Sequence, residues 1–320
     1  MNSSTSMRAI AIKQFGTANE LQLLELPIPT PGFGEVLIQV AASGVNPVDV
    51  LLREGFAAGA HPQFPIIMGV DLSGTIASIG LGVTEFKPGD TVYAHKKGGN
   101  GTYAEYAILP SSWVAHQPTS LNHLQASAVP CAALTAHQAI TEVLQIIAGQ
   151  TILITGGAGG VGSFAVQIAA SSGAHVIATA SSRNHQFLQE LGASEVIDYN
   201  TTDFVEAVRL HHPDGVDAVL TTVGGDTKNH SIKAIRDQGH LVWISSEDPA
   251  GPPPERNIQT TMFYARADTK SLDAITGLIN AGKLKPFIED VLPLERAKEA
   301  QQRIASGRVR GKLVLMVAEL

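Results

Sequence analysis

The stretch Thr151-Ile-Leu-Ile-Thr-Gly-Gly-Ala-Gly-Gly-Val-Gly162 decides the fold of this chain. Its first five residues have the apolar character of a short β-strand, and residues 162–170 read as a helix. Gly157, Gly159 and Gly162 lie between them at the spacing of a dinucleotide-binding turn, which lets the backbone approach a pyrophosphate and the helix pack on the strand. Because backbone N–H groups and the helix dipole there attract a dianion, the stretch predicts a cofactor site.

Strands and helices alternate after this turn. We expect further strands at residues 175–180, 195–197, 216–223 and 240–245, with helices between them. Such alternation is typical of a parallel sheet with helices on both faces. The first 120 residues instead read as strands separated by Pro and Gly, the pattern of a small β domain. We therefore predict an α/β protein. Its domains are residues 1–125, to which residues 268–320 return, and the doubly wound dinucleotide-binding domain 126–267.

The end of the second strand of this domain predicts which dinucleotide binds. A site for NADH has Asp or Glu about 20 residues after the glycines, to hold the ribose 2′-hydroxyl. Here the strand ends Ala178-Thr-Ala-Ser-Ser-Arg-Asn184, and no acidic residue lies between Gly157 and Gln189. The hydroxyls of Ser181 and Ser182 and the guanidinium of Arg183 would bind a 2′-phosphate. NADPH is therefore favoured; the alternative is that Arg183 is only a solvated residue at a helix start.

Composition limits the other classes of function. The 320 residues are 44% apolar, enough for a large core and about two domains. Lys and Arg number 22 against 29 Asp and Glu, and this net charge of −7 disfavours general nucleic-acid binding. No apolar run approaches the ~18 residues of a membrane span, and residues 1–6 lack the features of a signal peptide. We expect a cytoplasmic protein that uses neither membrane nor nucleic acid.

Three other nucleotide-binding or hydrolytic chemistries lack their motifs. The chain has no G-x-S-x-G pentapeptide, which α/β-hydrolases need. Gly162 is followed by Ser163, so no P-loop lysine is present. The short-chain dehydrogenases carry a Tyr-x-x-x-Lys pair downstream of their glycines, whereas Tyr93 and Lys97 lie upstream. These three readings are therefore rejected.

Ordered sequence blocks along nearly the whole chain carry a family resemblance. They are Pro31-Gly-Phe-Gly-Glu-Val-Leu-Ile38, Gly44-Val-Asn-Pro-Val-Asp-Val-Leu-Leu-Arg53, Met68-Gly-Val-Asp-Leu-Ser-Gly74, Lys87-Pro-Gly-Asp-Thr-Val92, Gly101-Thr-Tyr-Ala-Glu-Tyr106, Gly157-Ala-Gly-Gly-Val-Gly162, Leu191-Gly-Ala-Ser-Glu-Val-Ile-Asp-Tyr199 and Arg310-Gly-Lys312. Together they resemble the medium-chain dehydrogenase/reductase superfamily, in its zinc-independent quinone oxidoreductase (ζ-crystallin-like) branch. The resemblance implies a GroES-like β-barrel domain beside a Rossmann domain, an active site in the cleft between them, and a homodimer.

The resemblance also implies site residues. Asn46 would bind the substrate or the nicotinamide ribose, or would only stabilise the turn before Pro47. Asp49 would order this segment, with Arg53 as a candidate partner, rather than act as an acid. The expected cofactor-binding residues are Thr135, Gly157, Gly159, Gly160, Val161, Gly162, Ser181, Ser182, Arg183, Tyr199, Val223, Gly224 and Ser245.

The positions of the superfamily's catalytic zinc ligands depart from the pattern Cys, His, Cys. The segment 46–49 has no cysteine, Val70 stands where the histidine would follow Gly69, and only Cys131 remains. One soft ligand does not make a site that needs three, so no metal is expected and Cys131 would be a small buried residue. Without a Lewis acid, quinones and α,β-unsaturated carbonyls are the feasible hydride acceptors. We expect an NADPH-dependent reductase of such compounds. The alternatives are a reductase of other carbonyl or enoyl substrates and a non-catalytic NADPH-binding protein.

Overall fold

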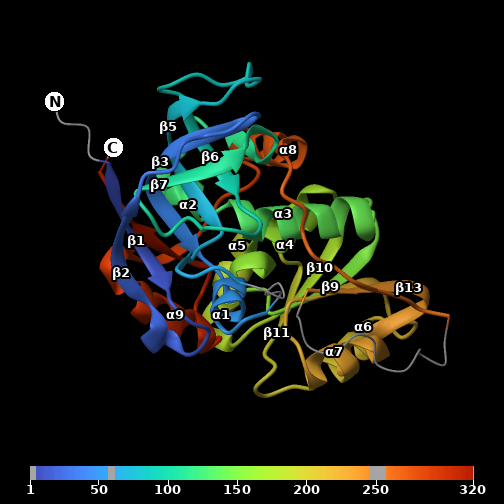
Figure 1. Ribbon diagram of the computed structural model, residues 1–320. Coiled ribbons are helices and arrows are strands. Elements are labelled where there is room, and N and C mark those ends of the chain that lie inside the picture. Colours follow the sequence, from blue (N-terminus) through green and yellow to red (C-terminus); the bar gives the residue numbers. More distant parts are fainter. Residues whose placement is uncertain (1–4, 57–61, 245–256, 320) are drawn as a thin grey trace. The chain divides into compact units, whose positions relative to one another are not determined.

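A computed structural model describes residues 5–56, 62–244 and 257–319 (Figure 1). The chain divides into two compact units. Unit 1 comprises Met1–Ala132, Ala267–Ala281 and Pro286–Leu320, and unit 2 comprises Ala133–Arg266 and Gly282–Lys285. None of the helices in the described ranges is both long and apolar enough to cross a lipid bilayer.

Unit 2 is built on a parallel sheet of six strands. In spatial order these are β11 (Glu195–Ile197), β10 (His175–Thr179), β9 (Thr151–Thr155), β12 (Val216–Thr221), β13 (Ile235–Trp243) and β14 (Gln259–Met262). Counted along the chain, this is the order 3-2-1-4-5-6 of a doubly wound dinucleotide-binding sheet. The chain changes direction across the sheet between β9 and β12, and the carboxyl ends of these two strands are where such sheets bind ligands.

Helices cover both faces of this sheet. Figure 1 shows α4 (Gly160–Ser171) on one side and α6 (Phe204–His211) and α7 (Asp226–Ser231) on the other, while α5 (His185–Glu190) follows β10. Helix α4 is buried along eight consecutive residues from Gly162 to Ala169, so it packs deeply against the sheet. Helix α6 is amphipathic and begins where the Asp203 side chain accepts hydrogen bonds from the N–H groups of Val205 and Glu206.

Unit 1 is mainly antiparallel β structure. Its larger sheet has the order β15 (Ile288–Pro293), β16 (Lys312–Met316), β3 (Glu35–Val45), β5 (Asp71–Ile79), β6 (Thr91–His95), β8 (Val114–His116), and β7 (Tyr106–Pro110) also pairs with β3. A small sheet joins β2 (Gln22–Pro27), β1 (Ser6–Ile12) and β4 (Ile66–Ile67). The helices are α1 (Pro47–Arg53), α2 (His123–Ser127), α8 (Thr269–Asn280) and α9 (Ala297–Ala305), and α3 (Pro130–Gln138) crosses the boundary into unit 2.

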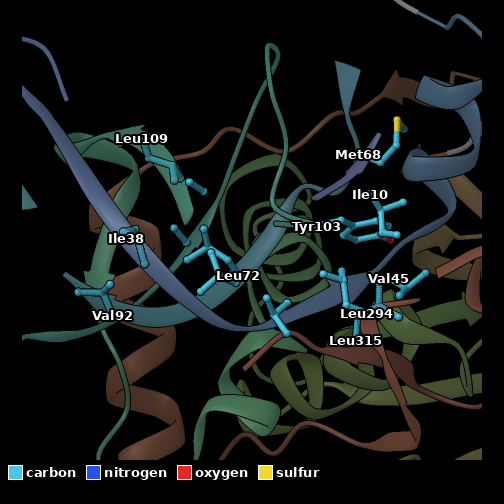
Figure 2. Close-up of a cluster of buried hydrophobic side chains, with 14 of the residues drawn as sticks. Ile10, Ile38, Val45, Met68, Leu72, Val92, Tyr103, Leu109, Leu294 and Leu315 are labelled. Atoms are coloured by element: carbon cyan, nitrogen blue, oxygen red, sulfur yellow. The ribbon is translucent and has the colours of Figure 1, made fainter. Parts of the chain in front are cut away.

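The core of unit 1 joins residues from both ends of the chain. Figure 2 shows Leu294 and Leu315 beside Val45, and all three belong to one buried cluster that also contains Ile38 and Leu72. Strand β16 pairs antiparallel with β3, with Leu313 opposite Val45. The C-terminal segment is therefore an integral part of the first unit.

The expectation of an α/β protein with a doubly wound sheet is confirmed. The description of the first 120 residues as strands and turns was incomplete, because α1 follows β3 directly. Asn46 is the N-cap of this helix and Pro47 occupies its first position, where the missing N–H of proline costs no hydrogen bond. These two residues are a helix-start signal as well as a turn signal.

Adjacent residues of β16 provide a test of how much the returning segment stabilises unit 1. Leu315 is fully buried, whereas the next residue, Met316, is 38% exposed. Leu315→Ala leaves a cavity, so we expect it to lower the free energy of unfolding of unit 1 by about 2–5 kcal/mol. Met316→Ala is the matched control and should change it by less than about 1 kcal/mol. Denaturant unfolding followed by tryptophan fluorescence and circular dichroism measures both, and equal effects would contradict the described packing.

Candidate functional site

The glycine-rich turn lies at the carboxyl end of β9. Gly156 has a φ of +67°, and α4 begins at Gly160 with Gly159 as its N-cap. The N–H of Gly157 donates to the carbonyl oxygen of Thr179 at 3.0 Å, which ties the turn to β10. The first i to i−4 hydrogen bond of α4 runs from Ser163 N–H to Gly159 O at 2.9 Å. The amides of residues 160–162 therefore have no acceptor within the helix and are oriented to bind an anion.

Close contacts require a glycine at position 162 and leave little room for a side chain at position 157. A Cβ at Gly162 would lie 2.2 Å from the carbonyl oxygen of Gly156, which no side chain tolerates. A Cβ at Gly157 would lie 3.0 Å from the Cβ of Ala178 on β10. At Gly159 the nearest atom is 3.4 Å away, an ordinary contact. The turn therefore has the shape of a dinucleotide-binding turn, with helix and strands in contact through Gly157 and Gly162.

Threonine side chains connect the ends of β9 and β12. Thr155 Oγ1 donates to Thr221 Oγ1 at 2.7 Å, and Thr221 Oγ1 donates to the carbonyl oxygen of Val223 at 2.8 Å. Thr222 Oγ1 donates to the carbonyl oxygen of Thr155 at 2.8 Å. These bonds hold the segment of Val223 and Gly224 beside the glycine-rich turn, with the Val223 side chain 40% exposed.

The remaining predicted nicotinamide contacts lie elsewhere along the chain. Thr135 is on α3 and is 8% exposed. Ser245 lies outside the described residues. The expected contact of Thr135 with the nicotinamide stays a prediction.

The predicted phosphate-binding residues follow β10 and β11, which are parallel neighbours. Ser181 precedes a single 3-10 turn, Ser182–Asn184, in which Ser182 and Arg183 are exposed. Tyr199 follows β11 and is 55% exposed. A hydrogen bond from Ser182 N–H to Asp198 Oδ2 at 2.9 Å links the two segments. The structure therefore brings Ser182 and Tyr199 to the same edge of the sheet, within reach of one nucleotide.

Asp198 is a residue that the sequence analysis missed. Hydrogen bonds from the N–H and side chain of Asn200, at 2.9 and 2.8 Å, lower the pKa of its carboxyl group, as does the N–H of Ser182. An ionised carboxylate therefore lies beside the predicted 2′-phosphate position, and it accepts the hydrogen bond of the Ser182 N–H. A site for NADH has its acid at the end of the second strand, whereas Asp198 directly follows the neighbouring third strand, β11. The pairing of β10 with β11 was the signal that would have indicated it.

In unit 1, Asn46 is buried and its side chain is fully hydrogen-bonded. Its Nδ2 donates to Asp71 Oδ2 at 2.9 Å, and its Oδ1 accepts from the ammonium of Lys312. Its backbone N–H donates to Asp49 Oδ2 at 2.7 Å. These bonds are those of the turn-stabilising alternative, and contact of Asn46 with a substrate or ribose stays a prediction.

Asp49 orders this segment from a fully buried position. Its Oδ2 also accepts the hydroxyl hydrogen of Tyr103 at 2.9 Å, while Oδ1 is buried without a hydrogen-bond partner. Burial raises the pKa of the Asp49 carboxyl group to about 7, although hydrogen bonds to the carboxylate oppose this. Arg53 does not pair with Asp49; it donates to the carbonyl oxygen of Gly16 and to Gln301.

Asp71 is the centre of the polar network and the place to test for a catalytic metal. Together with His95 and Cys131 it forms a group of three potential metal ligands. However, its Oδ1 is bound by His95 Nδ1 at 3.1 Å and by the N–H of Cys131 at 2.8 Å. Its Oδ2 is bound by Asn46, and the Lys312 ammonium lies 3.5 Å away. A carboxylate already neutralised by a lysine and saturated with donors does not fit the catalytic zinc of the alcohol dehydrogenases.

The buried Asp49 predicts a pH-dependent stability. Because its pKa is about 7 in the folded protein and about 4 when unfolded, the folded state holds the proton more tightly. Between about pH 4 and pH 7 the unfolded state releases this proton while the folded state keeps it. The free energy of unfolding therefore falls as pH rises through this range.

Asp49→Asn cannot ionise and should escape this loss. We expect its stability relative to the native protein to improve between pH 4 and pH 7.5 by about 2–4 kcal/mol, at about 1.4 kcal/mol per pKa unit. Urea unfolding at the two pH values measures this. Asp273→Asn, at an exposed position on α8, is the control and should show no such trend. A constant difference for Asp49→Asn would contradict the assignment.

Known proteins match this chain along nearly its whole length. Residues 32–119 match the family described as "Alcohol dehydrogenase GroES-like domain", and residues 191–315 match the family described as "Zinc-binding dehydrogenase". The mitochondrial NAD(P)H oxidoreductase RTN4IP1 of Bos taurus is 31% identical over 98% of this chain and 90% of its own length. The chloroplastic quinone-oxidoreductase QR1 of Triphysaria versicolor is 33% identical over 97% of this chain and 98% of its own.

A solved structure agrees with these relatives. The mycobacterial protein Rv1454c, determined in complex with NADPH, has a TM-score of 0.88 and 28% identity over 98% of this chain and 100% of its own. The GroES-like match coincides with the β unit, and the sheet order and glycine-rich turn are those of a nicotinamide-dinucleotide domain. The chain therefore belongs to the medium-chain dehydrogenase/reductase superfamily, among its quinone oxidoreductase-like NAD(P)H oxidoreductases.

Proposed function

We propose that this protein reduces quinones or α,β-unsaturated carbonyl compounds with NADPH and without a catalytic zinc ion. The observation that carries the proposal is the hydrogen bonding of Asp71. The carboxylate that stands next to the superfamily's zinc-ligand position is bound by Asn46, His95 and the Cys131 amide and is paired with Lys312. A fixed ammonium group replaces the doubly charged ion in this part of unit 1.

The type of acceptor follows from this replacement. Reduction of a plain ketone, or oxidation of an alcohol, is assisted by a Lewis acid on the oxygen atom. A quinone or an enone already delocalises the arriving negative charge onto its oxygen, so it needs mainly correct positioning and a hydrogen bond. A reductase of other carbonyl or enoyl compounds is the second candidate, and a protein that binds NADPH without turnover is the third.

The dinucleotide-binding residues of unit 2 suit a bound NADPH. The amides of Gly160, Val161 and Gly162, which as first-turn groups have no acceptor within α4, would hold the pyrophosphate. The backbone at Val223 and Gly224 would allow close approach of the nicotinamide ribose. When bound, the nicotinamide supplies the hydride. The protein's part is to fix the position of the ring and the acceptor and to exclude water.

The choice of NADPH rests on the residues after β10. Arg183 and the hydroxyls of Ser181 and Ser182 offer charge-assisted hydrogen bonds to a 2′-phosphate, and the exposed ring of Tyr199 offers a surface beside it. Asp198 acts against this preference, because its charge repels a phosphate. One arginine and two hydroxyls outweigh one carboxylate that is already hydrogen-bonded to Asn200.

For the location and assembly of the protein, we propose a cytoplasmic homodimer. Besides its cofactor, its partner would be the small-molecule acceptor.

Charge reversal at Arg183 tests the cofactor assignment. Loss of a charged hydrogen bond costs about 1.5–3 kcal/mol, so Arg183→Glu should raise KM for NADPH by at least about tenfold at unchanged kcat. KM for NADH, measured on the same samples, should change little because NADH lacks the phosphate. Asp198→Asn should shift the preference the other way, towards NADPH. An unchanged KM for NADPH in Arg183→Glu would remove Arg183 from the site.

A panel of acceptors tests the function itself. Oxidation of NADPH is followed at steady state with 1,2- and 1,4-quinones, linear enones, simple ketones and aldehydes, in metal-free buffer and with added chelator. We expect turnover with quinones or enones, little with simple ketones, and no effect of the chelator. Gly162→Ala is the negative control, since its methyl group would collide with Gly156 O and displace the cofactor turn. Turnover abolished by the chelator would overturn the proposal, and NADPH binding without any turnover would favour the third candidate.

A further inference from the structure

We propose that His175, Glu195 and His212 form a binding site for one divalent transition-metal ion, zinc in the first place, on unit 2. His175 Nε2 lies 2.6 Å from Glu195 Oε1, and His212 Nε2 lies 3.4 Å from the same oxygen. The two imidazole rings are 5.6 Å apart between centroids. One ligand atom from each of the three residues lies within 4.8 Å of the other two.

The fold brings these residues together from separate elements. His175 is the first residue of β10 and Glu195 is the first residue of β11, the parallel strand beside it. His212 comes directly after α6. No short sequence motif joins the three positions, so the site is visible only once the sheet has formed.

This cluster is separate from the dinucleotide site. Because β9, β10 and β11 are parallel, the first residues of these strands lie at the amino edge of the sheet, whereas the glycine-rich turn follows the carboxyl end of β9. A strand of five residues spans about 16 Å at about 3.3 Å per residue. The proposal is therefore independent of the zinc-free chemistry proposed for this protein.

The donor set is one that zinc prefers. Two imidazole nitrogens and one carboxylate oxygen bind zinc at about 2.0–2.2 Å, with water at the remaining position. In a tetrahedron with these bond lengths the ligand atoms lie about 3.3 Å apart. The two nitrogen–oxygen separations of 2.6 and 3.4 Å bracket this value, and the ligand nitrogens of the two histidines lie within 4.8 Å of each other, so movement of the side chains alone would complete the site. The three side chains are 40%, 33% and 24% exposed, which leaves access for a hydrated ion.

The charge around the cluster also suits a cation. Burial works against ionisation of Glu195, but hydrogen bonds with His175 and His212 lower the pKa of its carboxyl group, so it is ionised at neutral pH. Within the described ranges, Glu195 contacts these two imidazoles and pairs with no lysine or arginine. In the Asp71 cluster, by contrast, the Lys312 ammonium already neutralises the carboxylate. The ion would lie between Glu195 and the two imidazole nitrogens and would balance the charge of the carboxylate.

Isothermal titration of the full chain with ZnCl2, after dialysis against chelator, tests the site. We expect one zinc ion to bind the native protein, and His212→Ala and Glu195→Gln to bind it about tenfold more weakly or worse. His211→Ala is the matched control, because this exposed neighbour lies outside the cluster; it should bind like the native protein. Cys131→Ser tests whether zinc binds instead at the cluster of Asp71, His95 and Cys131. This variant should bind zinc with unchanged affinity.

Thermal unfolding supplies a second readout that does not depend on turnover. Saturating zinc should raise the melting temperature of the native protein and of His211→Ala, but not that of His212→Ala, since a ligand that binds only the folded state stabilises it. Circular dichroism without zinc verifies that the variants fold. Absence of binding to the native protein, equal binding by His212→Ala, or loss of binding in Cys131→Ser would each overturn the proposal. Activity with NADPH should be unchanged in His212→Ala, so the outcome is separate from that of the proposed function.

Discussion

The first turn of α4 lies against the end of β9 at a distance that leaves no room for a side chain. A methyl group at Gly162 would lie 2.2 Å from the carbonyl oxygen of Gly156. This contact sets where α4 begins, and it therefore sets the direction of the amide groups of residues 160–162. The hydrogen bonds of Thr155, Thr221 and Thr222 fix the neighbouring end of β12 against the same turn. The dinucleotide-binding edge of unit 2 is thus determined by backbone approach, with side chains in a supporting role.

Unit 1 provides a different kind of order, based on buried charge. Asp71 collects hydrogen bonds from a helix N-terminus, a histidine and an asparagine, with Lys312 as its counter-ion. Buried ionic groups are expensive unless they are paired and hydrogen-bonded, and this network satisfies Asp71 completely. Asn46 links Asp71 to Asp49 through one hydrogen bond to each carboxylate. One oxygen of Asp49 is buried without a hydrogen-bond partner, which is consistent with the raised pKa of this carboxyl group. A segment held by so many polar bonds keeps a fixed shape.

The sequence predicted those features that depend on neighbouring residues. The glycine-rich turn, the strand at Thr151–Thr155 and the strand at Glu195–Ile197 were located correctly, because apolar runs and glycine spacing are local signals. Helix α1 was missed, since Asn46 and Pro47 are typical of turns as well as of helix starts. Asp198 beside Ser182, and Glu195 between His175 and His212, were beyond sequence reasoning, because strand pairing creates these contacts. Whether Asn46 or Thr135 touches a ligand is likewise not encoded in any local pattern.

The pairing of β16 with β3 also affects how the chain can fold as it is synthesised. Unit 2 ends at Lys285, so all of its strands have left the ribosome while unit 1 still lacks its last segment. Until Lys312 emerges, Asp71 lacks the ammonium group that pairs with it and Asn46 Oδ1 lacks its hydrogen-bond donor. Until Leu315 emerges, the apolar cluster around Val45 is incomplete. Domains generally fold as units during synthesis. Unit 1 contributes the earliest strands of the chain and is also the unit completed last, so the edge of β3 that pairs with β16 stays unpaired until residues 312–316 emerge.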